Sequence, residues 1–126
     1  MTIYADNTYV SECLKYELDP AFCRDTVVIA SGTGVLDRNT VLSKVTASGK
    51  FKILAPGASD GTQTAAGILL SQVDATSVDV TAVALVRGPA IISPNGCVWP
   101  ADITTNQKAT ALANLLTINI KAGIGA

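Results

Sequence analysis

Short β-branched and apolar runs recur along this chain, each closed by a turn that contains glycine or proline, and they limit what it can fold into. Residues 26–30 (TVVIA) form one such run, and the turn SGTG follows it. The runs at residues 40–45 and 50–54 flank the four-residue loop TASG, which is typical of a β-hairpin. Further strands are predicted at 65–70, at 78–87 with a bulge near Thr81-Ala82, at 90–93 as an edge or crossing strand, and at 117–120.

One helix is predicted near the C-terminal end. Thr104 and Gln107 have the spacing of a capping box, in which each side chain bonds the backbone N–H of the other residue. The apolar residues that follow indicate one buried stripe of Ala109, Leu112, Ala113 and Leu116, with Leu115 beside it. These elements predict an α+β, mainly β domain: short strands in a β-tulip or barrel-like sheet, with one or two short helices.

Composition excludes several classes of function. The chain has 126 residues, enough for one domain, and a formal net charge of −1 with scattered basic residues, so nucleic-acid and anionic-membrane binding are not expected. No apolar run approaches the ~20 residues of a membrane span, and the first ten residues lack the pattern of a signal peptide. Three cysteines without a CxxC motif favour a reducing compartment.

The absence of histidine argues against an enzyme, because it removes the commonest general base and metal ligand. Ser43 and Lys44 are adjacent in a predicted strand and would point to opposite faces. The carboxylate pairs Asp74/Asp79 and Glu17/Asp19 are interpreted as solvated charges, and Cys97 has no histidine to activate it. We expect no catalysis, cofactor or metal, and no small-molecule substrate.

Residues 59–70 (SDGTQTAAGILL) could form a phosphate loop, a calcium loop or part of the scaffold. A phosphate loop leads into a helix and usually carries lysine, and a calcium loop needs several oxygen ligands. Here a strand is predicted after the turn, and Asp60 is the sole acidic ligand available. We therefore expect a turn and a buried strand, with Gly67 at a close backbone approach or bulge. The three cysteines are similarly interpreted as buried apolar residues rather than zinc ligands.

The first nineteen residues differ from the rest, because they carry all three tyrosines. Residues 14–18 alternate between apolar and charged, and Pro20 ends this pattern. We predict an extended N-terminal arm over residues 1–19 and a single domain over residues 20–126, which should fold without the arm. For residues 10–18, pairing within the chain's own sheet and addition as a strand to another chain remain open. The candidate arm contacts are Ile3, Tyr4, Tyr9, Val10, Leu14, Tyr16 and Leu18.

Trp99 is the single tryptophan, and Pro100 follows it. It could anchor the core or its rim, or it could be an interface hot spot, where tryptophan is enriched. Trp99, Pro100 and Arg87 are the candidate interface residues of the domain.

Taken in order, these elements resemble the head decoration protein family of tailed phages, of the lambda type. The resemblance covers residues 14–120 and rests on the order and spacing of several segments: LKYE at 14–17, FCRD at 22–25, TVL at 40–42 with KV at 44–45, GKF at 49–51, DG at 60–61, AGIL at 66–69, VRG at 86–88 and VWP at 98–100, then the helix and closing strand.

The resemblance implies a small β-rich fold and a structural role. Family members are expected to sit as homotrimers on the outer surface of the expanded head and to cement it against internal DNA pressure. The partner would be the major capsid protein, contacted by the N-terminal arm, and the protein would be made in the cytoplasm of the bacterial host. The alternative is a soluble β-barrel module that binds a small ligand or a protein outside any virion.

Overall fold

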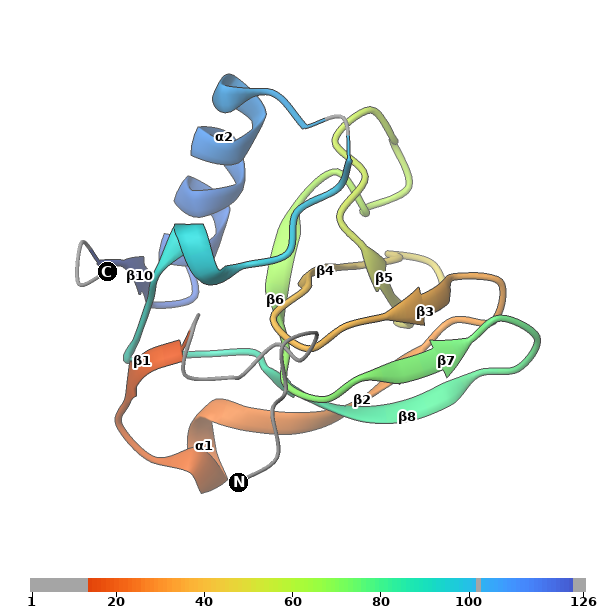
Figure 1. Ribbon diagram of the computed structural model, residues 1–126, viewed down its shortest axis with the longest axis horizontal. Helices are drawn as coiled ribbons and strands as arrows, with labels where there is room; N and C mark the ends of the chain where they lie inside the picture. Colours follow the sequence, from red (N-terminus) through yellow and green to blue (C-terminus); the bar gives the residue numbers. More distant parts are fainter. Residues whose placement is uncertain (1–13, 102, 124–126) are drawn as a thin grey trace, which may run out of the picture.

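A closed five-stranded barrel forms the centre of the computed structural model, which describes residues 14–101 and 103–123 (Figure 1). Neighbouring strands are antiparallel, except that β2 and β5 are parallel and meet at Ile29 and Phe51. The predicted mainly β fold with a barrel-like sheet is confirmed. The strands, in order around the barrel, are β2 (Arg24–Ile29), β5 (Phe51–Ile53), β4 (Val41–Lys44), β6 (Ala65–Leu69) and β8 (Val80–Leu85).

The hairpin predicted around the TASG loop is confirmed as β4 and β5. Lys44 lies opposite Phe51, and the Gly49 N–H donates to the Val45 carbonyl at 2.8 Å. Gly49 has a φ of 74°, which an L side chain rarely adopts, so glycine suits this position in the loop.

The scaffold interpretation of residues 59–70 is also confirmed. The Asp60 carboxylate accepts a bond from the Thr62 backbone N–H at 3.2 Å and closes the turn before β6. Gly67 lies opposite Leu42, where the register of β4 and β6 shifts by one residue. A Cβ at Gly67 would lie 2.6 Å from the Leu85 carbonyl oxygen. Gly67 therefore marks both a bulge and a close backbone approach.

The predicted bulge in β8 is wrong. The register between β2 and β8 is continuous from Arg24↔Leu85 to Ile29↔Val80. Thr81 and Val83 face outward while Ala82 and Ala84 are buried, so the alternation is regular. The sequence suggested a slip because alanine and an exposed valine blur the contrast between the two faces.

Two further sheets flank the barrel (Figure 1). β3 (Gly34–Leu36) and β7 (Val73–Ala75) form an antiparallel pair that the sequence did not predict. The terminal sheet consists of β1 (Leu14–Glu17), β9 (Ala90–Ile92) and β10 (Ile120–Ala122), and β9 lies at its centre. The strand predicted at residues 90–93 is therefore observed as β9, but the alternative that it lies at the edge of a sheet is wrong. The closing strand begins at residue 120 rather than 117, because residues 117–119 form a turn in which Asn119 has a φ of 65°.

Two α-helices and one 3-10 helix complete the described chain: α1 (Pro20–Cys23), η2 (Pro94–Gly96) and α2 (Thr105–Leu116). The predicted capping box is confirmed, since the Gln107 N–H donates to the Thr104 hydroxyl at 3.1 Å and the Thr104 N–H donates to the Gln107 carboxamide oxygen at 2.9 Å.

The buried stripe predicted for α2 is wrong. The helix packs against β6 and β10 through Ala111 and Leu115, whereas Ala109 and Ala113 are exposed and Leu116 is 57% exposed. Residues 111 and 115 are one turn apart and share a face, with Leu112 half-buried beside them. Apolar residues occur on several sides of this helix, so periodicity alone did not identify the packed face.

The barrel wall separates two hydrophobic clusters. One cluster contains Leu42, Leu69 and Ala84 with residues of β3 and β7, and the other contains Val41, Ile68 and Leu85 with residues of α2 and the terminal sheet. Consecutive strand residues point to opposite faces, so each wall strand serves both clusters. Apolar runs such as Ile68-Leu69-Leu70 follow from burial on both faces.

Candidate functional site

The terminal sheet gathers both ends of the described chain (Figure 1). β1 runs antiparallel to β9 and β10 runs parallel to it, so the two terminal strands flank the same central strand. Among the described residues β1 pairs with β9 alone, which leaves its other edge available to a further strand. Residues 1–13 precede this edge strand directly.

β1 is firmly attached to the domain. Leu14 lies opposite Ile92 and packs against the cluster that includes Leu115. The Leu18 N–H donates to the Pro89 carbonyl at 3.0 Å. Of the two alternatives left open for residues 10–18, pairing within the chain's own sheet is therefore observed for Leu14–Glu17.

The end of β1 is also held by an ion pair. Arg24 Nε lies 3.1 Å from Glu17 Oε2 and Arg24 Nη2 lies 2.5 Å from Glu17 Oε1, a bidentate arrangement that is stronger than a single hydrogen bond. The Glu17 side chain is only 9% exposed, and the Arg24 side chain is 36% exposed. This ion pair ties the last residue of β1 to the first residue of β2.

An exposed apolar surface lies next to the terminal sheet. Its large side chains, Leu18, Phe22 and Leu116, are 60%, 54% and 57% exposed. Leu18 is bonded to Pro89, and Pro89 and Leu116 line the same hollow of about 290 Å³. We call Leu18, Phe22, Pro89 and Leu116 the terminal patch. These four residues are the candidates for an apolar interaction site beside the terminal sheet.

Arg87 borders the terminal patch. Its guanidinium lies 5.3 Å from the centre of the Phe22 ring and 2.7 Å from the Asp25 carboxylate. It also donates to the Phe22 carbonyl. These contacts hold the Phe22 ring at the surface and place a partly neutralised cation beside it.

Trp99 lies elsewhere, between η2 and α2. Its indole N–H donates to the Pro94 carbonyl at 3.0 Å, and Lys108 Nζ lies 5.7 Å from the ring centre. Trp99 is half-buried and packs against the cluster of the terminal sheet, while Pro100 lines a separate hollow with residues 54–58. The structure therefore does not bring Trp99 and Pro100 together with Arg87.

The candidate arm residues divide at residue 14. Ile3, Tyr4, Tyr9 and Val10 lie outside the described residues. Leu14 and Tyr16 belong to β1, and Tyr16 lies opposite Ile91, while Leu18 is part of the terminal patch. Sequence reasoning missed Phe22 and Leu116, because one lies in a four-residue helix and the other was assigned to the buried stripe of α2.

A family model decides which group of proteins this arrangement belongs to. The model for the bacteriophage lambda head decoration protein D matches residues 2–120. The chain belongs to this family. A comparison with curated proteins gave no match. Membership of the head decoration family supports a capsid decoration role and a place in the phage head, and the family is one of structural phage proteins.

Two of the polar side chains considered in the sequence, Asp19 and Ser43, have structural roles in this head decoration protein. Asp19 accepts a bond from the Ala21 N–H at 2.9 Å at the start of α1. Ser43 is buried and donates to the backbone of β5, whereas Lys44 is exposed, so the two face apart as predicted. Cys23 is fully buried, as predicted, and Cys97 is half-buried against the core; Cys13 lies outside the described residues.

Three surface carboxylates have lowered pKa values. A hydrogen bond from the Thr62 hydroxyl lowers the pKa of Asp60, and one from the Thr76 hydroxyl lowers the pKa of Asp74. The bond from Lys50 lowers the pKa of Asp79, and the Ser31 N–H adds to this effect. These groups stay ionised at neutral pH, which suits turn and ion-pair roles rather than proton donation.

The described part of this family member was compared with two further requirements, those of a metal site and of a membrane-spanning helix, and meets neither. Residues 14–101 and 103–123 contain no group of three or more Cys, Asp or Glu side chains that could hold a metal ion. Over the same part of the chain, no helix is long and apolar enough to cross a membrane.

Proposed function

We propose that this chain binds the outer surface of the expanded phage head as a homotrimer and cements the shell against the pressure of packaged DNA. The main support is the juxtaposition of an edge strand, the terminal patch and the entry of the N-terminal segment on one part of a head decoration protein. The protein would be made in the bacterial cytoplasm and act on the virion surface.

The proposed arm has two parts. Residues 1–13 would order on the major capsid protein and add a strand to it, as Tyr4 and Tyr9 contact apolar pockets. Residues 14–19 would be the root of the arm, since Leu14–Glu17 pairs with β9. Ordering an extended segment costs roughly 1–2 kcal/mol per residue, so it should order where a partner supplies hydrogen bonds.

A trimer suits this mode of binding. A closed three-fold assembly matches a three-fold position on an icosahedral shell. Three arms held together would bind with far greater avidity than one, because the second and third attachments are intramolecular. Arg87, Trp99 and Pro100 remain candidate contacts between subunits or with the capsid.

Co-sedimentation with expanded heads of the cognate phage tests the proposal. We expect saturable binding of the full chain, and at least about a hundredfold weaker binding when residues 1–13 or 1–19 are deleted, since three attachments are lost per trimer. Absence of binding by the full chain would contradict the head-binding proposal and favour the soluble-module alternative.

Substitutions in the terminal patch refine the test. Leu18→Ser and Leu116→Ser should weaken head binding, because each removes exposed apolar surface beside the arm. Val78→Ser is the matched control: Val78 is 63% exposed, in the turn that joins β7 and β8, which lies across the molecule from α2 and β10 (Figure 1). Equal binding by all three variants would exclude the terminal patch from the interface.

A further inference from the structure

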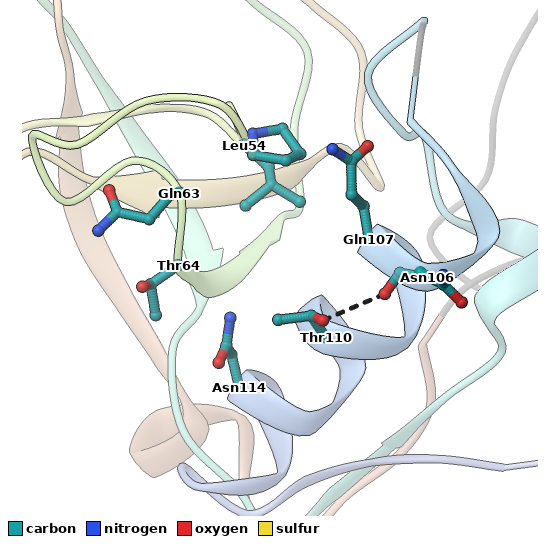
Figure 2. A pocket seen from close by; sticks show the side chains of 8 residues that line it. Leu54, Gln63, Thr64, Asn106, Gln107, Thr110 and Asn114 are labelled. Carbon is teal, nitrogen blue, oxygen red and sulfur yellow. Dashed lines mark hydrogen bonds between the residues drawn. The ribbon is translucent and has the colours of Figure 1, made fainter.

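Two cysteine thiols lie at opposite ends of β9. Neither lines the hollow between α2 and the loop that joins β5 to β6, whose labelled side chains carry only amide, hydroxyl and aliphatic groups (Figure 2). The Cys23 thiol donates to the Pro89 carbonyl at 3.8 Å, and the Cys97 thiol donates to the Ser93 carbonyl at 3.5 Å. Four residues of an extended chain span about 13 Å, so Cys23 and Cys97 do not pair with each other.

The Cys97 thiol lies on the side of β9 that faces β1. The Leu18 N–H, just after β1, donates to the Pro89 carbonyl, so this carbonyl points toward β1. Carbonyl groups alternate in direction along a strand, and the carbonyl four residues later, that of Ser93, therefore points the same way. Ser93 has a φ of −100° and a ψ of 115°, so the extended chain continues to it. The Cys97 sulfur, 3.5 Å from the Ser93 oxygen, thus lies next to the path of the chain that leads into β1.

The register of β1 assigns a further cysteine to the same carbonyl. Leu14 lies opposite Ile92 in an antiparallel pair, so this register, continued by one residue, assigns Cys13 to Ser93. Cys13 lies outside the described residues, but its peptide bond to Leu14 keeps the two Cα atoms about 3.8 Å apart. Leu14 and Cys97 also pack against the same hydrophobic cluster. The chain therefore brings Cys13 and Cys97 toward one carbonyl group.

We propose that Cys13 and Cys97 form a disulfide bond when the protein passes from the bacterial cytoplasm to an oxidising exterior. The cytoplasm keeps thiols reduced, so the bond forms after the host is lysed. One thiolate attacks a small disulfide such as glutathione disulfide and releases one glutathione thiol, and the other thiolate then displaces the second glutathione. The two cysteines lose two electrons and two protons, and one glutathione disulfide becomes two glutathione thiols. The proposal depends on the proposed function only for the place of oxidation.

The disulfide joins the junction of the arm and the domain to the segment between η2 and α2. It closes a long loop of the chain, from residue 13 to residue 97, and such a cross-link stabilises a fold mainly by restricting the unfolded chain. It also adds a covalent connection beside β1, which otherwise pairs with β9 alone among the described residues. A load on the N-terminal arm is then carried by this bond as well as by the hydrogen bonds of β1.

Peptide mapping of the oxidised full chain tests this proposal, because cleavage after lysine and arginine places each cysteine in a different tryptic peptide. Cys13 lies in residues 1–15, Cys23 in residues 16–24 and Cys97 in residues 88–108. The reduced chain is incubated with glutathione disulfide, quenched in acid and digested without reductant. We expect peptides 1–15 and 88–108 to be joined, at a mass two hydrogen atoms below their sum, and to separate when a phosphine reductant is added.

Thermal unfolding measures what the bond does to the domain. We expect the Tm of the oxidised chain to exceed that of the reduced chain by about 5 °C or more. This difference should vanish in Cys13→Ser and in Cys97→Ser, which cannot form the bond. Cys23→Ala is the control, because Cys23 lies at the other end of β9 and the variant should keep both the cross-link and the difference in Tm.

Several outcomes would overturn the proposal. Linkage of peptide 16–24 to either of the others, glutathione adducts without a cross-link, or linkage found only between two chains would each do so. An equal rise in Tm for Cys97→Ser would show that the bond is not its cause. Because the assay uses the soluble chain without phage heads, failure of the cross-link and failure of head binding are separate results.

Discussion

Gly67 lies where barrel strands approach too closely for a side chain. An added Cβ would lie 2.6 Å from the Leu85 carbonyl oxygen, in the backbone of the neighbouring strand. We expect Gly67→Ala to lower the free energy of unfolding by about 1–3 kcal/mol, because the strands must move apart. Gly57→Ala is the control, since a Cβ there meets nothing within 4 Å, and its unfolding midpoint should not fall. Equal midpoints in urea denaturation would contradict this prediction.

Asp79 should make the stability of the domain sensitive to acid. Lys50 Nζ lies 2.7 Å from its carboxylate, and the Ser31 N–H donates to it at 2.8 Å. These bonds lower the pKa of Asp79 in the folded state, so they stabilise the fold above the unfolded-state value of about 3.9 and are lost as pH falls through the lower, folded-state pKa. Asp79→Asn should flatten the acid side of a plot of unfolding free energy against pH, and Lys50→Met should do the same. If the unfolding free energy of both variants still falls at low pH as it does in the unsubstituted chain, the Lys50–Asp79 ion pair is not the cause of the acid sensitivity.

At the scale of elements, alanine substitutions of two adjacent leucines in α2 should differ greatly in their effect on stability. Leu115 is fully buried, whereas Leu116 is 57% exposed in the terminal patch. We expect Leu115→Ala to cost about 2–5 kcal/mol of stability and Leu116→Ala to stay within about 0.5 kcal/mol. Thermal unfolding of the two variants checks this directly. A larger loss for Leu116→Ala would mean that the helix packs by the stripe first predicted from the sequence.

Local chemistry determined which elements could be predicted from the sequence. The capping box at Thr104 and the TASG loop are contained within a few residues, so the start of α2 and the hairpin of β4 and β5 could be predicted. The face of α2 depends on β6 and β10, which are distant in the sequence, and it could not. β3 and β7 are three residues each, and the turn residues around them conceal any periodicity.

The candidate surfaces could likewise be predicted only where their residues are close together in the sequence. The tyrosines and alternating residues before Pro20 indicated an arm, because that signal is local. The terminal patch could not be predicted, since it joins Leu18 and Phe22 to Leu116 through long-range folding.

The molecule as a whole depends on one barrel wall that serves two hydrophobic clusters. Val41 and Leu42 are consecutive, yet they belong to different clusters. The terminal sheet and α2 therefore share their packing with the barrel rather than forming a separate unit. Substitutions or deletions within residues 14–19, the root of the arm, should therefore lower the free energy of unfolding of the whole domain.

N-terminal deletions separate the arm from its root. Removing residues 1–13 leaves β1 intact and should change the unfolding free energy by less than about 1 kcal/mol. Removing residues 1–19 deletes β1, the Glu17–Arg24 ion pair and the Leu18–Pro89 bond. The domain should still fold, but with a loss of roughly 2–4 kcal/mol, since each hydrogen bond contributes about 1 kcal/mol.

Urea denaturation of the full chain and both deletions measures this difference, and Glu17→Gln in the full chain isolates the ion pair. If both deletions bind heads equally weakly while only the longer one loses stability, residues 1–13 hold the capsid and β1 holds the domain. If the shorter deletion is already as unstable as the longer one, residues 1–13 support the fold themselves, and the division of the arm at residue 14 is wrong.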